Sequence, residues 1–128
     1  MKLLPLLTHL ADEDVGVIAQ DLFIDMLPAE ADEAVLLRNP LQGTFINHEL
    51  PGYYQAEFDV IVRVPAAKYD AGEAKIEAVV AVLTVANLQL DDMWFNYARP
   101  ETLPVSYPLS KGNLIEFSVR MACCFVRR

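Results

Sequence analysis

The stretch YQAEFDVIVRV, residues 54–64, decides the fold of this chain because apolar and mainly polar residues alternate along it. A period of two is typical of a β-strand that buries one face against a core. That face collects the side chains of Tyr54, Ala56, Phe58, Val60, Val62 and Val64. Pro65 then ends the pattern, because proline has no backbone N–H to donate to a neighbouring strand. The sequence therefore predicts a long, half-buried strand near the middle of the chain.

A helix is expected after this strand, and a second long strand closes the sequence. Asp70 and Glu73 have the spacing of a capping box, in which each side chain accepts a hydrogen bond from the other residue's backbone N–H. Apolar residues then recur at helical spacing, which predicts a helix packed on a sheet: Ile76, Val79, Val80 and Leu83. Alternation returns near the end of the chain, where one face holds Ile115, Phe117, Val119, Met121, Cys123 and Phe125.

Shorter elements complete the predicted fold class. Leu3, Leu7 and Leu10 form one stripe of an N-terminal helix, with Pro5 in its first turn. Apolar or aromatic runs predict strands at 22–24, 34–38 and 93–99, and a further strand start at Leu88 and Leu90. We therefore predict an α+β fold, as a single domain over residues 1–128. Its mixed, mostly antiparallel sheet would have about four to five strands, with one main helix packed on it. Segments 39–53 and 99–112, rich in proline, are expected to be connections.

Charge excludes several classes of partner. The 128 residues carry a formal net charge of −8, and 54% of them are hydrophobic. An acidic chain lacks the basic face that nucleic-acid binding requires, and it does not favour anionic lipid. Eight acids and one base fall within residues 1–33, so this segment carries almost all of the excess. The segment is either a solvated acidic loop or a surface that meets the basic residues of another subunit.

Side chains that carry chemistry are sparse. His9 and His48 have no partner at metal-binding spacing, and the adjacent carboxylates do not form a pair in two different environments. The serines lack a nucleophile elbow, and the glycines form no phosphate loop. We therefore expect no enzyme activity, no cofactor and no metal site.

The two cysteines, Cys123 and Cys124, are adjacent. Neighbouring residues of a strand point to opposite faces, so we expect both to be reduced, one in the core and one half-buried. The N-terminal residues 1–14 lack the pattern of a secretory leader, and we expect the protein to be made and kept in the cytosol unless it leaves within a larger particle.

Five segments carry a resemblance to a known family. They are QDLFI (20–24), MLP (26–28), LLRNPLQGT (36–44), INHELPGYY (46–54) and FDVIVR (58–63). With these motifs, of which Leu50-Pro51-Gly52-Tyr53 is the most distinctive, the chain resembles the small minor capsid or tail-completion proteins of long-tailed bacteriophages. That group is similar to the tail terminators. The resemblance spans roughly residues 3–125 and carries no catalytic signature.

The resemblance implies a structural virion protein that forms a ring, commonly of six copies, between the tail tube and the head connector. It implies the tail tube protein and a connector or neck protein as partners, with DNA passing through the lumen without specific binding. Aromatic and proline-rich loops often anchor interfaces. The candidate assembly residues are therefore Pro40, His48, Pro51, Tyr53, Arg99, Tyr107 and Lys111. Asp12, Asp14, Asp32 and Glu33 are candidates for lining the lumen or for contacts between subunits.

Other functions remain open at this point. The main alternative is another neck component, such as a head-completion protein. A small ligand-binding or hydrolase α+β domain would show a convergent pocket with a perturbed titratable group. A dimeric adaptor is a further alternative.

Overall fold

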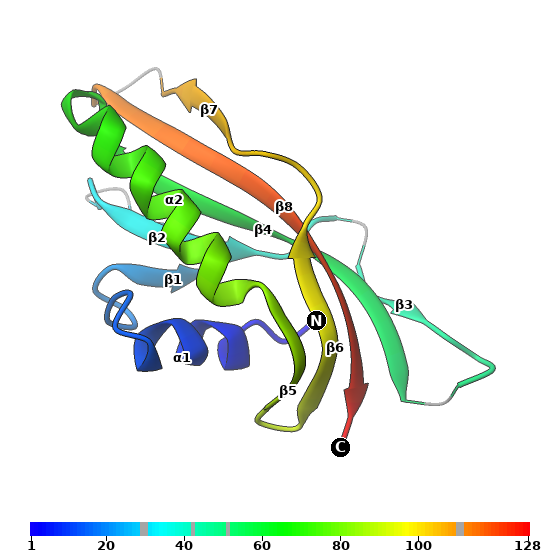
Figure 1. The fold of residues 1–128 in the computed structure, drawn as a ribbon. Coiled ribbons are helices and arrows are strands. Elements are labelled where there is room, and N and C mark those ends of the chain that lie inside the picture. Colours follow the sequence, from blue (N-terminus) through cyan, green and yellow to red (C-terminus); the bar gives the residue numbers. More distant parts are fainter. Residues whose placement is uncertain (29–30, 42, 51, 110–111) are drawn as a thin grey trace.

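The structure, a computed structural model, describes residues 1–28, 31–41, 43–50, 52–109 and 112–128. Its helices are α1 (Leu4–Asp12), the 3₁₀ turn η1 (Ala66–Lys68) and α2 (Tyr69–Leu83) (Figure 1). Its strands are β1 (Leu22–Ile24), β2 (Ala34–Arg38), β3 (Phe45–Ile46), β4 (Tyr53–Pro65), β5 (Val85–Leu90), β6 (Met93–Pro100), β7 (Val105–Pro108) and β8 (Leu114–Arg127). Among the described residues, no helix is both long and apolar enough to cross a membrane.

The described strands join one eight-stranded sheet in the order β1-β2-β4-β8-β6-β5, with β3 beside β4 and β7 beside β8. The β1–β2 pair is parallel and the other strand pairs are antiparallel. The predicted α+β class and mostly antiparallel sheet are confirmed. The predicted count of four to five strands is wrong, because β3 and β7 form within the two expected connections and Leu88–Leu90 belongs to a separate strand, β5. β3 and β7 are too short to show a period of their own, and the long β4 and β8 supply their partners, whereas β5 pairs with β6.

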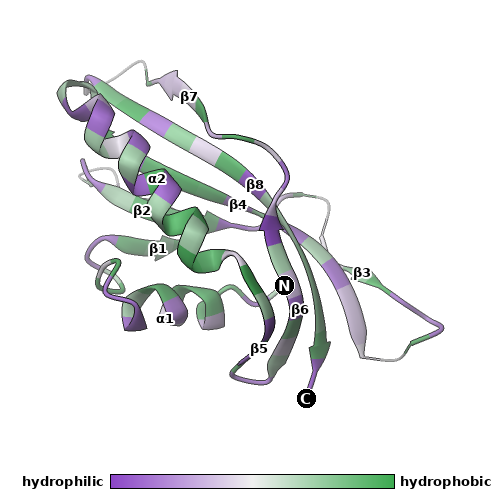
Figure 2. Cartoon of the chain, in the orientation of Figure 1, coloured by the Kyte–Doolittle hydropathy of each residue, from purple (hydrophilic) through white to green (hydrophobic). Residues whose placement is uncertain are grey.

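The core lies on one face of the sheet, as the alternation predicts. Phe58, Val60 and Val62 of β4 pair with Met121, Val119 and Phe117 of β8, and all six side chains are buried. Both helices cover this face, where α2 packs on β4 and β8, and α1 packs on α2 and β1 (Figures 1 and 2). The opposite face carries neither helix, and we call it the open face.

The start of α2 differs from the prediction. Asp70 does not cap the helix: Lys68 is the N-cap residue and no side chain caps the helix by a hydrogen bond. The chain already coils in η1, so the helix begins one residue before Asp70. Asp70 therefore lies in the first turn, where its charge favours the helix dipole.

The two cysteines also differ from the prediction. Cys123 faces the core as expected, but Cys124, expected to be half-buried, is 0% exposed on the open face. It lies between the cross-strand neighbours Gln55 and Tyr97, and the Asn96 amide lies 4.0 Å from its sulfur. Both thiols are free, as predicted.

We expect a thiol reagent to modify Cys123 only when the protein unfolds. Burial raises the pKa of its thiol to about 12, so the reactive thiolate is nearly absent from the folded protein. The measurement is the modification rate of Cys124→Ala, which isolates Cys123, against denaturant concentration. Adding Ala74→Cys on the exposed side of α2 provides a reactive control. A Cys123 that reacts as fast as this control without denaturant would contradict the prediction.

Candidate functional site

The open face divides into a charged half and an aromatic half. Side chains that point away from the helices line it, because β2, β4, β6 and β8 pair in a register that aligns these positions across the sheet. The charged half lies where β2, β4 and β8 run side by side. The aromatic half lies further along β4 and β8, where β6 runs beside β8.

Asp59 is the centre of the charged half. Its carboxylate is 7% exposed and accepts hydrogen bonds from Arg120 Nε at 2.9 Å and Arg38 Nη2 at 3.3 Å. Arg120 also lies 3.5 Å from Glu57. The hydrogen bond and charge of Asp59 raise the pKa of the Arg120 guanidinium. A second ion pair joins β4 and β8 further along the strands, where Arg63 Nη2 lies 2.9 Å from Glu116 Oε2. The charges of this half therefore neutralise one another across three strands.

Two predicted assembly residues border the charged half. Pro40 lines a hollow of about 550 Å³ together with Arg38, Asp59 and Arg120. Tyr107 lies on β7, opposite Glu116 in the register with β8. Partial burial, followed by the negative charge of Glu116, raises the pKa of Tyr107. The hydroxyl of Tyr107 therefore stays neutral up to a higher pH than that of an ordinary tyrosine. The residue is 37% exposed at the surface.

The aromatic half carries two arginines that are stacked on rings. The Arg99 guanidinium lies 4.3 Å from the ring centre of Tyr97, and that of Arg128 lies 4.7 Å from the ring centre of Trp94. Both rings belong to β6, and the side chains of both arginines are exposed. Tyr53 belongs to β4, on the other side of β8 from β6. A hydrogen bond with Cys124 raises the pKa of Tyr53. This half therefore presents flat apolar rings and positive charge together.

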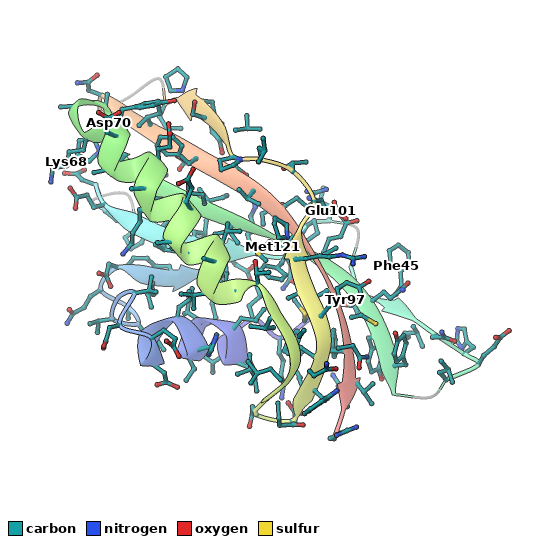
Figure 3. All side chains as sticks on the ribbon, in the orientation of Figure 1. Phe45, Lys68, Asp70, Tyr97, Glu101 and Met121 are labelled. Atoms are coloured by element: carbon teal, nitrogen blue, oxygen red, sulfur yellow. The ribbon has the colours of Figure 1, made fainter. Side chains whose placement is uncertain are left out.

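A hairpin formed by β3 and the start of β4 projects beyond the rest of the sheet (Figure 1). It exposes apolar side chains: Phe45 is 53% exposed, Ile46 62% and Leu50 55%. Asn47 shapes the turn by accepting hydrogen bonds from the backbone N–H groups of Glu49 and Leu50. Figure 3 marks Phe45 on this hairpin and Tyr97 on β6. Exposed side chains of this size, gathered on a projecting element, are typical of a surface that another protein covers.

The structure brings Pro40, Tyr53, Arg99 and Tyr107 to the open face or its border, and it exposes His48 in the turn of the hairpin. Pro51 and Lys111 lie outside the described residues. The sequence patterns did not predict two residues of these surfaces, Phe45 on the hairpin and Arg128 in the aromatic half. Phe45 belongs to a strand of two residues, and Arg128 finds its ring only through the pairing of β6 with β8.

The predicted acidic residues lie elsewhere. Asp12 and Asp14 are exposed where α1 ends, and Asp32 and Glu33 precede β2. Glu33 forms an ion pair with Lys68, so its charge is already compensated within the chain. Across the described parts of the chain, no group of three or more His, Cys, Asp or Glu side chains could hold a metal ion.

Comparison with known proteins identifies the family. The family model described as "Bacteriophage tail terminator protein" matches residues 9–126. No curated protein matches the sequence. A chain from the solved structure "Virion of native gene transfer agent (GTA) particle" has the same fold, at a TM-score of 0.71 and 14% identity. The alignment covers 94% of this chain and 91% of that chain. Another solved chain, with 17% identity over 94% of this chain and 89% of its own length, has a TM-score of only 0.46.

The match spans most of the sequence, and the open sheet with two covering helices is shared with a chain of a virion particle. The description of the family is that of a structural protein of the phage tail. The chain belongs to the bacteriophage tail terminator family and is a structural protein of the virion.

Proposed function

We propose that this protein closes the tail tube and joins it to the head connector by assembling into a ring of identical subunits, commonly six. Membership of the tail terminator family supports this placement at the junction of tail and neck. A ring requires that each subunit offer a surface to each of its two neighbours and others to the proteins above and below it.

The observation that carries the proposal is the open face with its projecting hairpin. The exposed Phe45, Ile46 and Leu50 leave the monomer with apolar surface that a neighbouring protein would bury. The hairpin and the predicted residues Pro40, Tyr53, Arg99 and Tyr107 would form the assembly surface, with the tail tube protein and a connector or neck protein as the other partners. Acidic side chains facing the lumen would repel DNA phosphates and let the genome pass.

The decisive experiment is electron microscopy of particles made without this protein. Tails of uncontrolled length that fail to join heads would support the terminator role. Tails of normal length beside heads that leak DNA would contradict it and indicate a head-completion protein instead.

We expect Phe45→Ser combined with Ile46→Ser to abolish tail completion while leaving the subunit folded. Both side chains are exposed, so their removal costs the monomer little, whereas loss of an apolar anchor weakens an interface strongly. The measurement is the yield of infectious particles when the variant complements particles lacking the protein. Leu4→Ser, which removes a side chain of similar exposure from α1, is the control. Normal yield with the hairpin variant would exclude the hairpin from assembly.

A further inference from the structure

The structure contains a second charged surface that complements the aromatic half of the open face. We call residues 12–18 the acidic segment: Asp12, Glu13 and Asp14 are exposed, and Val17 and Ile18 beside them are 54% and 39% exposed. The ion pairs within the described residues involve none of these three carboxylates. The segment therefore presents negative charge together with apolar side chains.

Three hydrogen bonds hold the backbone of the acidic segment. Lys75 of α2 donates a hydrogen bond from Nζ to the Val15 carbonyl at 2.7 Å. Asp21 accepts the backbone N–H of Val17 at 2.5 Å, and the backbone N–H of Val15 reaches the Leu10 carbonyl at 3.0 Å. A surface already ordered in the free subunit loses little conformational entropy on binding.

The matching surface is the arginine–aromatic patch, which we define as Trp94, Tyr97, Arg99 and Arg128. Each guanidinium stacks on its ring, at 4.3 Å and 4.7 Å, and neither arginine takes part in an ion pair of the described residues, so its donors can bind a carboxylate. The nearby Glu57 does not neutralise the patch, because it is engaged with Arg120. The patch thus combines two positive charges with two rings that apolar side chains can cover.

The two surfaces lie on different faces of the sheet: the acidic segment follows α1 on the side that carries the helices, where Lys75 of α2 contacts it, and the patch lies on the open face. The acidic segment leads into β1, at one end of the strand order, and Ile18 forms a bridge with Leu22 there. The patch lies on β6, next to β5 at the other end of that order. Figure 1 shows the turn after α1 at the left and β6 to the right of α1, with the β3–β4 hairpin beyond it. Contact between two different surfaces joins subunits head to tail, and such an assembly forms a ring when the rotation from one subunit to the next closes.

We infer that the arginine–aromatic patch of one subunit binds the acidic segment of a second copy of this chain. This inference rests on the proposed ring and names its subunit contact. It also assigns the acids at the end of α1 to a protein contact rather than to the lumen, because Val17 and Ile18 suit a covered surface and not a water-filled channel for DNA. Patch-to-patch contact is disfavoured, since it would place arginines against arginines.

Two charge-reversal variants test the contact. The patch variant carries Arg99→Glu and Arg128→Glu, and the segment variant carries Asp12→Lys and Glu13→Lys. Lysine at the C-terminal end of a helix favours the helix dipole, so the segment variant should fold. When one variant is present alone, side chains of like charge face one another at every subunit contact. In an equal mixture, every contact of an alternating ring again joins opposite charges.

Self-association of the purified proteins is measured by sedimentation, and tail completion by complementation of particles that lack the protein. We expect each variant alone to lose association or completion by about tenfold or more, and the mixture to regain it. Glu73→Lys with Glu77→Lys, the same charge change on the exposed side of α2, should behave like the unmodified protein. Circular dichroism shows that each variant is folded.

The outcomes separate the alternatives. Full activity of both variants in both assays, or a mixture of folded variants that regains nothing, overturns the inference. Loss with the patch variant alone would indicate patch-to-patch contact, and would also overturn it. If the mixture regains association while particles lacking the protein form normal tails, the contact stands and the proposed terminator function fails.

Discussion

Replacing Arg120 by alanine is expected to lower the free energy of unfolding by about 3 kcal/mol. Asp59 is almost fully buried, and Arg120 supplies its shortest hydrogen bond, at 2.9 Å, and a second at 3.4 Å. Without Arg120, the one partner that the carboxylate keeps among the described residues is Arg38, at 3.3 Å. A buried carboxylate that loses a partner retains its desolvation cost without the compensating interaction. Urea denaturation followed by circular dichroism gives the measurement.

Arg99→Ala is the matched control for this prediction. Arg99 lies on the neighbouring strand β6, is exposed and stacks on Tyr97 without an ion pair among the described residues. Its removal should change the free energy of unfolding by less than about 0.5 kcal/mol. Equal losses for Arg99→Ala and Arg120→Ala would show that the buried carboxylate of Asp59 does not depend on Arg120.

Replacing Gly72 by valine is expected to lower the free energy of unfolding by about 3 kcal/mol. Gly72 lies in the first turns of α2, facing the sheet: a Cβ there would lie 2.6 Å from both Phe117 Cε2 and Val64 Cγ2. Real side chains do not pack at that distance, so either α2 or the side chains of Phe117 and Val64 must shift. Thermal unfolding should show a midpoint lower by about 10 °C.

The matched control is Ala74→Val, on the exposed side of the same helix. It introduces the same β-branched side chain without a collision and should cost less than about 1 kcal/mol, the difference in helix propensity. Gly72→Ala should fall between the two, because alanine favours a helix but still brings a Cβ against Phe117. A Gly72→Val variant as stable as Ala74→Val would mean that α2 can move outward freely.

Local patterns predicted the main elements well because their physics is local. Alternation along 54–64 and 115–125 placed β4 and β8, since a strand with one buried face needs an apolar residue at every second position. The helical spacing of Ile76, Val79 and Leu83 placed α2 on the same principle, and all three side chains are buried. The start of that helix was predicted less well, because η1 coils the chain before the capping motif.

Pairing between distant segments was beyond local patterns. Asp59 and Arg120 are 61 residues apart and meet only because β4 and β8 align them directly. Cys124 is buried because Tyr97 and Gln55 arrive beside it from β6 and β4. The register between strands depends on the packing of a whole sheet, and no window of a few residues contains it.

The candidate surfaces show the same division. From sequence alone followed the acidic character of the first 33 residues, the aromatic and proline-rich segments, and the resemblance to phage tail proteins, because composition and motifs belong to single segments. Only the tertiary structure decided that Tyr53, Arg99 and Tyr107 share one face, that arginines stack on Trp94 and Tyr97, and that the acidic segment lies on the side of the sheet that carries the helices. The reason is physical: which side chains share a surface depends on strand order and twist, which arise only when all the strands bury their apolar faces together.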